Sequence, residues 1–175
     1  AVTTGVPIIN VTGGNLYMYA QLSGSQGLQK NGNGVYSPRY NPADYTYTGT
    51  NFFNGGTVQI ARDGHLGDPS NPIVVSANTN LQNFAGTTLG AARTISLANG
   101  TVLTAQNGAA NNSLTLNGAI TGGGGLTFNT GFFTLGGANT YTGNTTIRSA
   151  TVTLGASSPL STGTLTLQTS ATTTG

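Results

Sequence analysis

The 175-residue chain contains no cysteine, no tryptophan and no glutamate, and charged residues make up only 5% of it. Its acids are Asp44, Asp63 and Asp68, and its five bases are scattered. Without cysteine the chain has no disulfide framework. Because five scattered bases cannot neutralise a run of phosphates, we expect no nucleic-acid binding.

Long apolar runs are also missing, and none approaches the ~20 residues of a membrane-spanning helix. The 28 glycines are spread along the whole chain, and each costs a helix interior about 1 kcal/mol. We therefore expect neither a membrane-spanning segment nor much helix. The glycine run at 122–125 lacks the following lysine of a phosphate-binding loop, and we expect no cofactor.

What the chain does contain is threonine, asparagine and glycine, with 31, 19 and 28 residues. Short runs of three to five residues alternate apolar with small polar side chains, as half-buried strands do. Turn-forming Gly-Gly, Asn-Gly and Pro separate these runs. The runs are 58–60, 73–75, 94–97, 101–103, 113–116, 126–128, 133–135, 151–154 and 164–167. Many short strands at close spacing predict an all-β fold.

Internal repetition separates the possible all-β folds. Tyr47–Gly49 matches Tyr141–Gly143, and Thr57–Ile60 matches Thr151–Leu154 at the same offset. A sandwich does not require such a repeat, whereas a solenoid buries its apolar residues only against neighbouring coils. Threonine and asparagine can also form ladders along successive coils. The sequence therefore favours a β-solenoid of short strands with Gly and Asn turns.

The solenoid is expected over residues 22–167, with two diverged repeat units at about 22–75 and 119–167. Residues 1–21 are interpreted as an N-terminal edge strand or cap. Residues 168–175 are interpreted as an extended C-terminal tail.

The segments 122–126, 133–143 and 151–155 together resemble the autotransporter-associated β-strand repeat. That repeat occurs in passenger regions of secreted bacterial surface proteins, which include adhesins, stalks and scaffolds. The resemblance implies a right-handed parallel β-helix. Together with few lysines, no cysteine and a small N-terminal residue, it favours a bacterial protein that is extracellular or on the cell surface after signal-peptide removal.

Catalytic machinery is not evident. His65 is the only histidine, and Asp63 and Asp68 flank it. A nucleophilic triad would need these groups aligned with a serine, but the second repeat has an ordinary turn at the same place. We therefore interpret the His65 segment as a solvated turn. Three acids are too few for a strong calcium site or a clear carboxylate pair, and we expect no bound metal and no enzymatic activity.

Tyrosines gather near the N-terminus, where six of the seven lie between residues 17 and 47. Aromatic rings with a polar group suit both interfaces and sugar stacking. Three interpretations stay open: a cap over the first coils, an intermolecular contact, and a platform for a cell-surface glycan or matrix. We predict that the contacts to a partner or glycan are made by Tyr36, Arg39, Tyr40 and Tyr45.

The two ends of a solenoid expose unpaired backbone groups, and capping coils normally cover them. Neither end of this sequence shows a charged cap. We predict that the contact between subunits (the joint) is formed by Val6, Ile8, Ile9, Leu165 and Leu167. A head-to-tail contact does not close and generates a filament. The leading hypothesis is a structural homo-oligomer of this kind, and the alternatives are a monomeric passenger segment acting as adhesin or stalk and a carbohydrate-binding or carbohydrate-cleaving β-helix.

Overall fold

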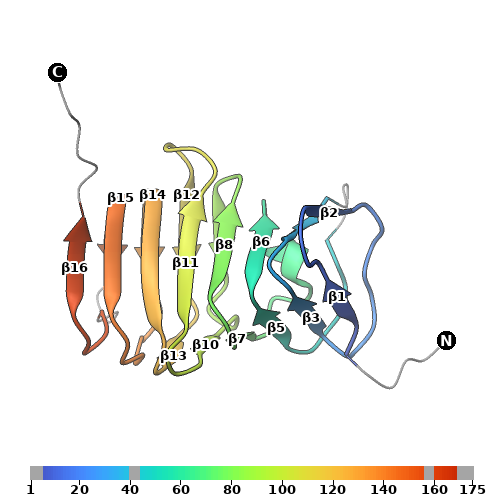
Figure 1. Ribbon diagram of the computed structural model, residues 1–175, viewed down its shortest axis with the longest axis horizontal. Coiled ribbons are helices and arrows are strands. Elements are labelled where there is room, and N and C mark those ends of the chain that lie inside the picture. The colour runs from blue at the N-terminus through green and yellow to red at the C-terminus, as the bar shows by residue number, and fades with distance from the viewer. Residues whose placement is uncertain (1–5, 40–43, 156–159, 169–175) are drawn as a thin grey trace.

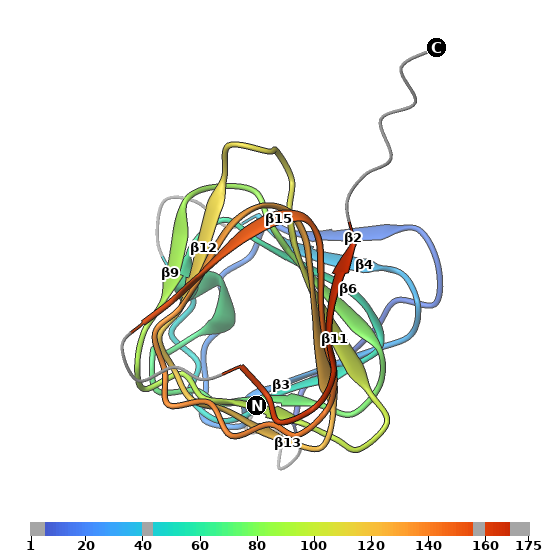
Figure 2. The ribbon, with the colours of Figure 1, turned by 90° about the vertical axis from the view of Figure 1, so that its left-hand side faces the viewer.

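The computed structural model describes residues 6–39, 44–155 and 160–168. Over these residues the chain is a parallel β-solenoid of about seven turns, which confirms the predicted fold class. The coils stack side by side along one axis, with the first at one end and the last at the other (Figure 1). Viewed along that axis, the coils superpose around a shared interior (Figure 2).

One face of the solenoid is a six-stranded parallel sheet. Its strands are β1 (Ile8–Asn10), β3 (Leu28–Asn31), β5 (Asn51–Asn54), β7 (Ile73–Val75), β10 (Ile95–Leu97) and β13 (Ile120–Gly122). Each strand belongs to a different coil, so every pairing joins residues that lie one coil apart in the chain.

A second, longer parallel sheet runs the whole length of the stack. Its strands are β2 (Asn15–Met18), β4 (Val35–Pro38), β6 (Gly56–Ile60), β8 (Thr79–Asn83), β11 (Val102–Asn107), β14 (Gly125–Leu135), β15 (Thr145–Leu154) and β16 (Leu165–Gln168). The strand β9 (Thr87–Leu89) pairs with β12 (Ser113–Leu116), and β12 also pairs with the second half of β14. Thr130 and Ser149 adopt positive φ angles of 63° and 47° inside β14 and β15.

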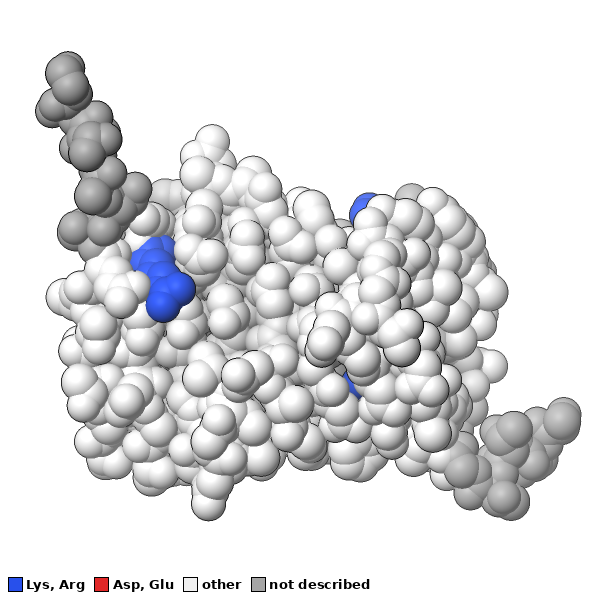
Figure 3. Space-filling model, viewed as in Figure 1, with Lys and Arg blue, Asp and Glu red and all other residues white. Residues whose placement is uncertain are grey.

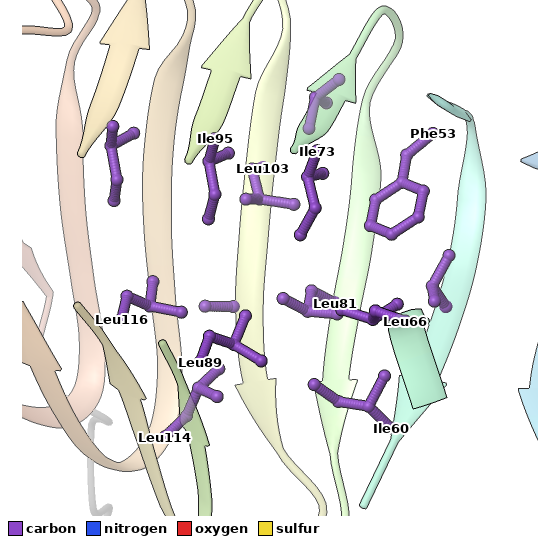
Figure 4. Close-up of a cluster of buried hydrophobic side chains, with 14 of the residues drawn as sticks. Phe53, Ile60, Leu66, Ile73, Leu81, Leu89, Ile95, Leu103, Leu114 and Leu116 are labelled. Atoms are coloured by element: carbon purple, nitrogen blue, oxygen red, sulfur yellow. The ribbon is translucent and has the colours of Figure 1, made fainter. Parts of the chain in front are cut away.

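The core consists of apolar side chains in rows, with one residue from each coil. The register of the longer sheet aligns one such row: Val58, Leu81, Ala105, Phe128 and Ile147. On the six-stranded sheet, Ile73, Ile95 and Ile120 form another buried row. Figure 4 shows buried side chains from successive coils, among them Ile73, Leu81 and Ile95, lying together in the interior. Burying each such side chain contributes roughly 1.5–3 kcal/mol.

Amide side chains form ladders between coils as well. On the outer face, Gln59 Nε2 donates to Gln82 Oε1 at 2.9 Å. In the interior, Asn83 Nδ2 donates to Asn107 Oδ1 at 2.8 Å, and both residues are buried. Buried amides of this kind are tolerated because the next coil satisfies them.

The structural repeat is the coil, and the repeat seen in the sequence does not follow it. Leu81 pairs with Ala105, 24 residues later, whereas Phe128 pairs with Ile147, only 19 residues later. Val58 lies in the row of Leu81, but its counterpart Val152 pairs with Phe133 on another face. The two sequence units therefore occupy non-equivalent positions in their coils.

Candidate functional site

The turn around the only histidine is buried at His65, Leu66 and Gly67, so the prediction of a solvated turn is wrong for these residues. Residues Asp63–Leu66 form a short 3-10 helix, η1, and His65 is 7% exposed. The backbone N–H of Ala61 donates to His65 Nδ1 at 3.3 Å. Burial, and then the nearby Arg62 charge, lower the pKa of His65 to about 4. The ring is therefore neutral at pH 7.

Both acids beside His65 have other partners. Asp63 Oδ1 accepts a hydrogen bond from Arg93 Nε at 2.5 Å. Asp68 Oδ1 accepts from the backbone N–H and the hydroxyl of Ser70 at 2.9 and 2.6 Å, and these bonds lower the pKa of Asp68. The hydrogen bonds of both carboxylates therefore stabilise the turn. Within residues 6–39, 44–155 and 160–168, no three His, Cys, Asp or Glu side chains come together as a metal site.

The burial of His65 predicts a pH-dependent stability. Because its pKa is about 4 in the folded chain and about 6.5 when unfolded, the unfolded chain takes up the proton first. We expect the free energy of unfolding to fall by about 3 kcal/mol as the pH falls from 6.5 to 4. Urea denaturation of the protein and of His65→Gln at several pH values measures this loss. Parallel pH profiles for the two proteins would contradict it.

The structure corrects two of the four predicted contact residues. Tyr36 is fully buried, because its place on β4 pairs it with Val58 and turns its ring inward. Tyr45 is also buried, and its hydroxyl donates to the carbonyl oxygen of Met18 at 3.2 Å. Tyr40 lies outside the described residues. Of the four, Arg39 is exposed.

Arg39 lies at a pocket of about 200 Å³ that the sequence analysis missed. We call it the corner pocket, because β4, β6 and β8 all end there. It is lined by Ser37, Pro38, Arg39, Gln59, Ile60, Ala61, Arg62, His65 and Phe84. The carboxyl ends of adjacent parallel strands bring these residues together, although they are about one coil apart in the chain. A coil length of 23 residues, such as that between Ile60 and Asn83, is the signal that would have found them.

The guanidinium group of Arg39 is held by aromatic rings. Its Cζ lies 5.3 Å from the ring centroid of Tyr17 and 5.8 Å from that of Phe84. Both distances are within the range of a cation–π interaction. Arg62, also at the pocket, forms a salt bridge with Asp44, with 2.8 Å between Nε and Oδ1.

The predicted joint residues lie at opposite ends of the stack (Figure 1). Ile8 on β1 is 58% exposed, and Val6 and Ile9 are partly exposed. At the other end, Leu165 and Leu167 on β16 are 48% and 70% exposed.

No protein-family model, curated protein or solved structure gives a significant match to this chain. The described residues form no helix with the length and apolar character needed to cross a membrane.

Proposed function

We propose that this protein is a structural subunit that stacks end to end into a filament on the bacterial cell surface. The observation that carries the proposal is the apolar end of the stack at β15 and β16. There the interior rows end in leucines that no further described coil covers: Leu154, Leu165 and Leu167. In a solenoid, each coil relies on the next one to bury its inner face.

A second copy of the chain fits this end better than a dissimilar partner would. Leu167 continues the interior row of Phe128, which is buried, and Ile147, which is partly buried. At the other end, Ile9 and Leu16 begin their rows and are only partly buried. Stacking one end on the other would extend the row that ends in Leu167 and the rows that begin with Ile9 and Leu16. Because β2 and β16 are the edge strands of the longer sheet, the same contact would also pair their open backbone groups.

The surface charge is compatible with close stacking. Figure 3 shows a few isolated Lys and Arg groups on an otherwise uncharged face. With a formal net charge of +2 over 175 residues, electrostatic repulsion between copies is weak. An extracellular location is supported by the composition and by the resemblance to autotransporter-associated repeats. A non-enzymatic role is supported by the partners of Asp63 and Asp68 in the turn around His65.

Leu167→Asp tests the filament, because it places a carboxylate on the proposed joint. We expect the unmodified protein to form uniform filaments in negative-stain electron microscopy and the variant to stay monomeric in light scattering. Burying an unpaired carboxylate at the joint costs several kcal/mol.

The matched control is Phe132→Asp, which changes another exposed apolar side chain, 50% exposed against 70% for Leu167, in the middle of β14. This control should still form filaments. A monomer across a wide concentration range for the unmodified protein would contradict the proposal and leave a monomeric adhesin or stalk. Equal loss of assembly in both variants would show that surface charge, and not the end, controls association.

A further inference from the structure

We propose that the corner pocket binds a carboxylate-bearing sugar, with Arg39 holding the carboxylate and Phe84 packing against the sugar ring. The inference does not require filament formation, although Tyr17, which contacts Arg39, lies on the edge strand β2. The pocket lining comes from β4, β6 and the segments after β4, β6 and β8, and none of it belongs to β1 or β16.

Charge is the first argument for an anionic ligand. The chain has only three acids, and each of them has another partner: Asp44 with Arg62, Asp63 with Arg93, and Asp68 with Ser70. Among the described residues, none of these three carboxylates forms a salt bridge with Arg39. Its positive charge at the pocket is available for an anion from outside. His65 adds no charge at neutral pH, since burial lowers its pKa to about 4.

The way Arg39 is held is the second argument. With Tyr17 and Phe84 both close to its guanidinium group, the side chain is positioned before a ligand arrives. A planar guanidinium presents parallel N–H donors that match the two oxygens of a carboxylate. Positioning in advance reduces the entropy lost on binding. A lysine at this place would offer the charge without the planar fork.

The apolar wall is the third argument, and it favours a sugar acid over a bare inorganic anion. Ile60, Ala61 and Phe84 line the pocket beside the arginines, and Phe84 is 42% exposed. A sugar ring has C–H faces that pack on such a wall and hydroxyl groups that reach its polar atoms. At about 200 Å³ the pocket is smaller than the roughly 300–1,000 Å³ typical of drug-sized ligands. It therefore suits one sugar unit of a longer chain.

Methyl glucuronide and methyl glucoside are matched probes, because they differ in having a carboxylate or a hydroxymethyl group. Saturation-transfer NMR titrations of the full chain work for monomers and filaments alike. We expect methyl glucuronide to bind at least about tenfold more tightly than methyl glucoside, since a charged bidentate contact is worth that much. Arg39→Gln should weaken the glucuronide about tenfold, and Arg39→Lys should weaken it measurably because the fork is lost.

Two further variants make the test specific. Phe84→Ala should weaken the glucuronide severalfold, whereas Arg148→Gln removes an exposed arginine on β15, away from the pocket, and should change nothing. Equal binding of the two sugars would overturn the proposal, as would an equal loss in Arg148→Gln. If inorganic phosphate binds as tightly as the glucuronide and Phe84→Ala has no effect, the site holds a simple anion and the sugar assignment is wrong.

Discussion

Replacing Arg93 with methionine is expected to destabilise the fold by about 3–5 kcal/mol, as loss of one partner from a buried charged pair does. The Arg93 side chain is completely buried, and its Nε donates to Asp63. Its two terminal nitrogens donate to four backbone carbonyl oxygens at 3.0–3.1 Å, those of Leu66, Gly67, Asp68 and Asn71. Methionine has similar length but donates no hydrogen bond, so the Asp63 carboxylate and the carbonyl groups of Gly67 and Asn71 lose the guanidinium donor. The carbonyl oxygens of Leu66 and Asp68 keep donors from Asn51 and Asn71.

Thermal melting and hydrogen exchange together measure this effect. For a chain of this size we expect the Tm to fall by roughly 10 °C. Faster exchange should be concentrated in the turn from Asp63 to Asn71, because Arg93 connects that turn to the next coil. Arg148→Met, at an exposed position, is the matched control and should change stability by no more than about 0.5 kcal/mol. An Arg93→Met protein within 1 kcal/mol of the unmodified one would show that water replaces the guanidinium.

Lys30→Met is expected to have the second-largest effect on stability. Lys30 lies in an interior row between Ile9 and Phe53, with no exposed surface, and burial lowers its pKa. Its Nζ donates to the carbonyl oxygens of three glycines at 2.5–2.8 Å: Gly32, Gly34 and Gly55. An orphaned buried acceptor costs about 1–3 kcal/mol. Since methionine also avoids burying a charge, we expect a net loss of about 2–4 kcal/mol.

The neighbouring substitution Gln29→Met is the control for Lys30→Met, because Gln29 points to the outer face of the same strand. Urea denaturation should place this control within about 1 kcal/mol of the unmodified protein. If Lys30→Met is as stable as the control, the three carbonyl groups do not depend on the ammonium group.

The fold class was predictable because each strand carries its own pattern. The alternating runs 113–116 and 151–154 lie in β12 and β15, with the leucines of 113–116 buried. A strand of a solenoid must turn every second residue inward, so local alternation contains the needed information. The mismatch between the sequence repeat and the coils was not predictable, because turns of different length give the coils different lengths.

The buried polar residues could not be found from the sequence. Lys30, Arg93 and His65 each look like surface residues in their local context, and all three are buried. Lys30 and Arg93 donate to carbonyl groups of the turns, whose positions depend on the path of the chain in other coils. Tyr36 was predicted to be exposed for a related reason. The face of the sheet on which its side chain lies depends on its pairing with Val58, and a shift of one residue in register would move every side chain of the strand to the opposite face.

All strand pairs of the solenoid are parallel, and this gives the molecule a direction. The face formed by β1 and β2 differs chemically from the face formed by β15 and β16, so a rod of stacked copies would have two unlike tips. Growth rates at the two tips would then differ. A copy altered only at its β16 face would still add to a growing tip through its other face, and it would stop further growth there at a small molar fraction.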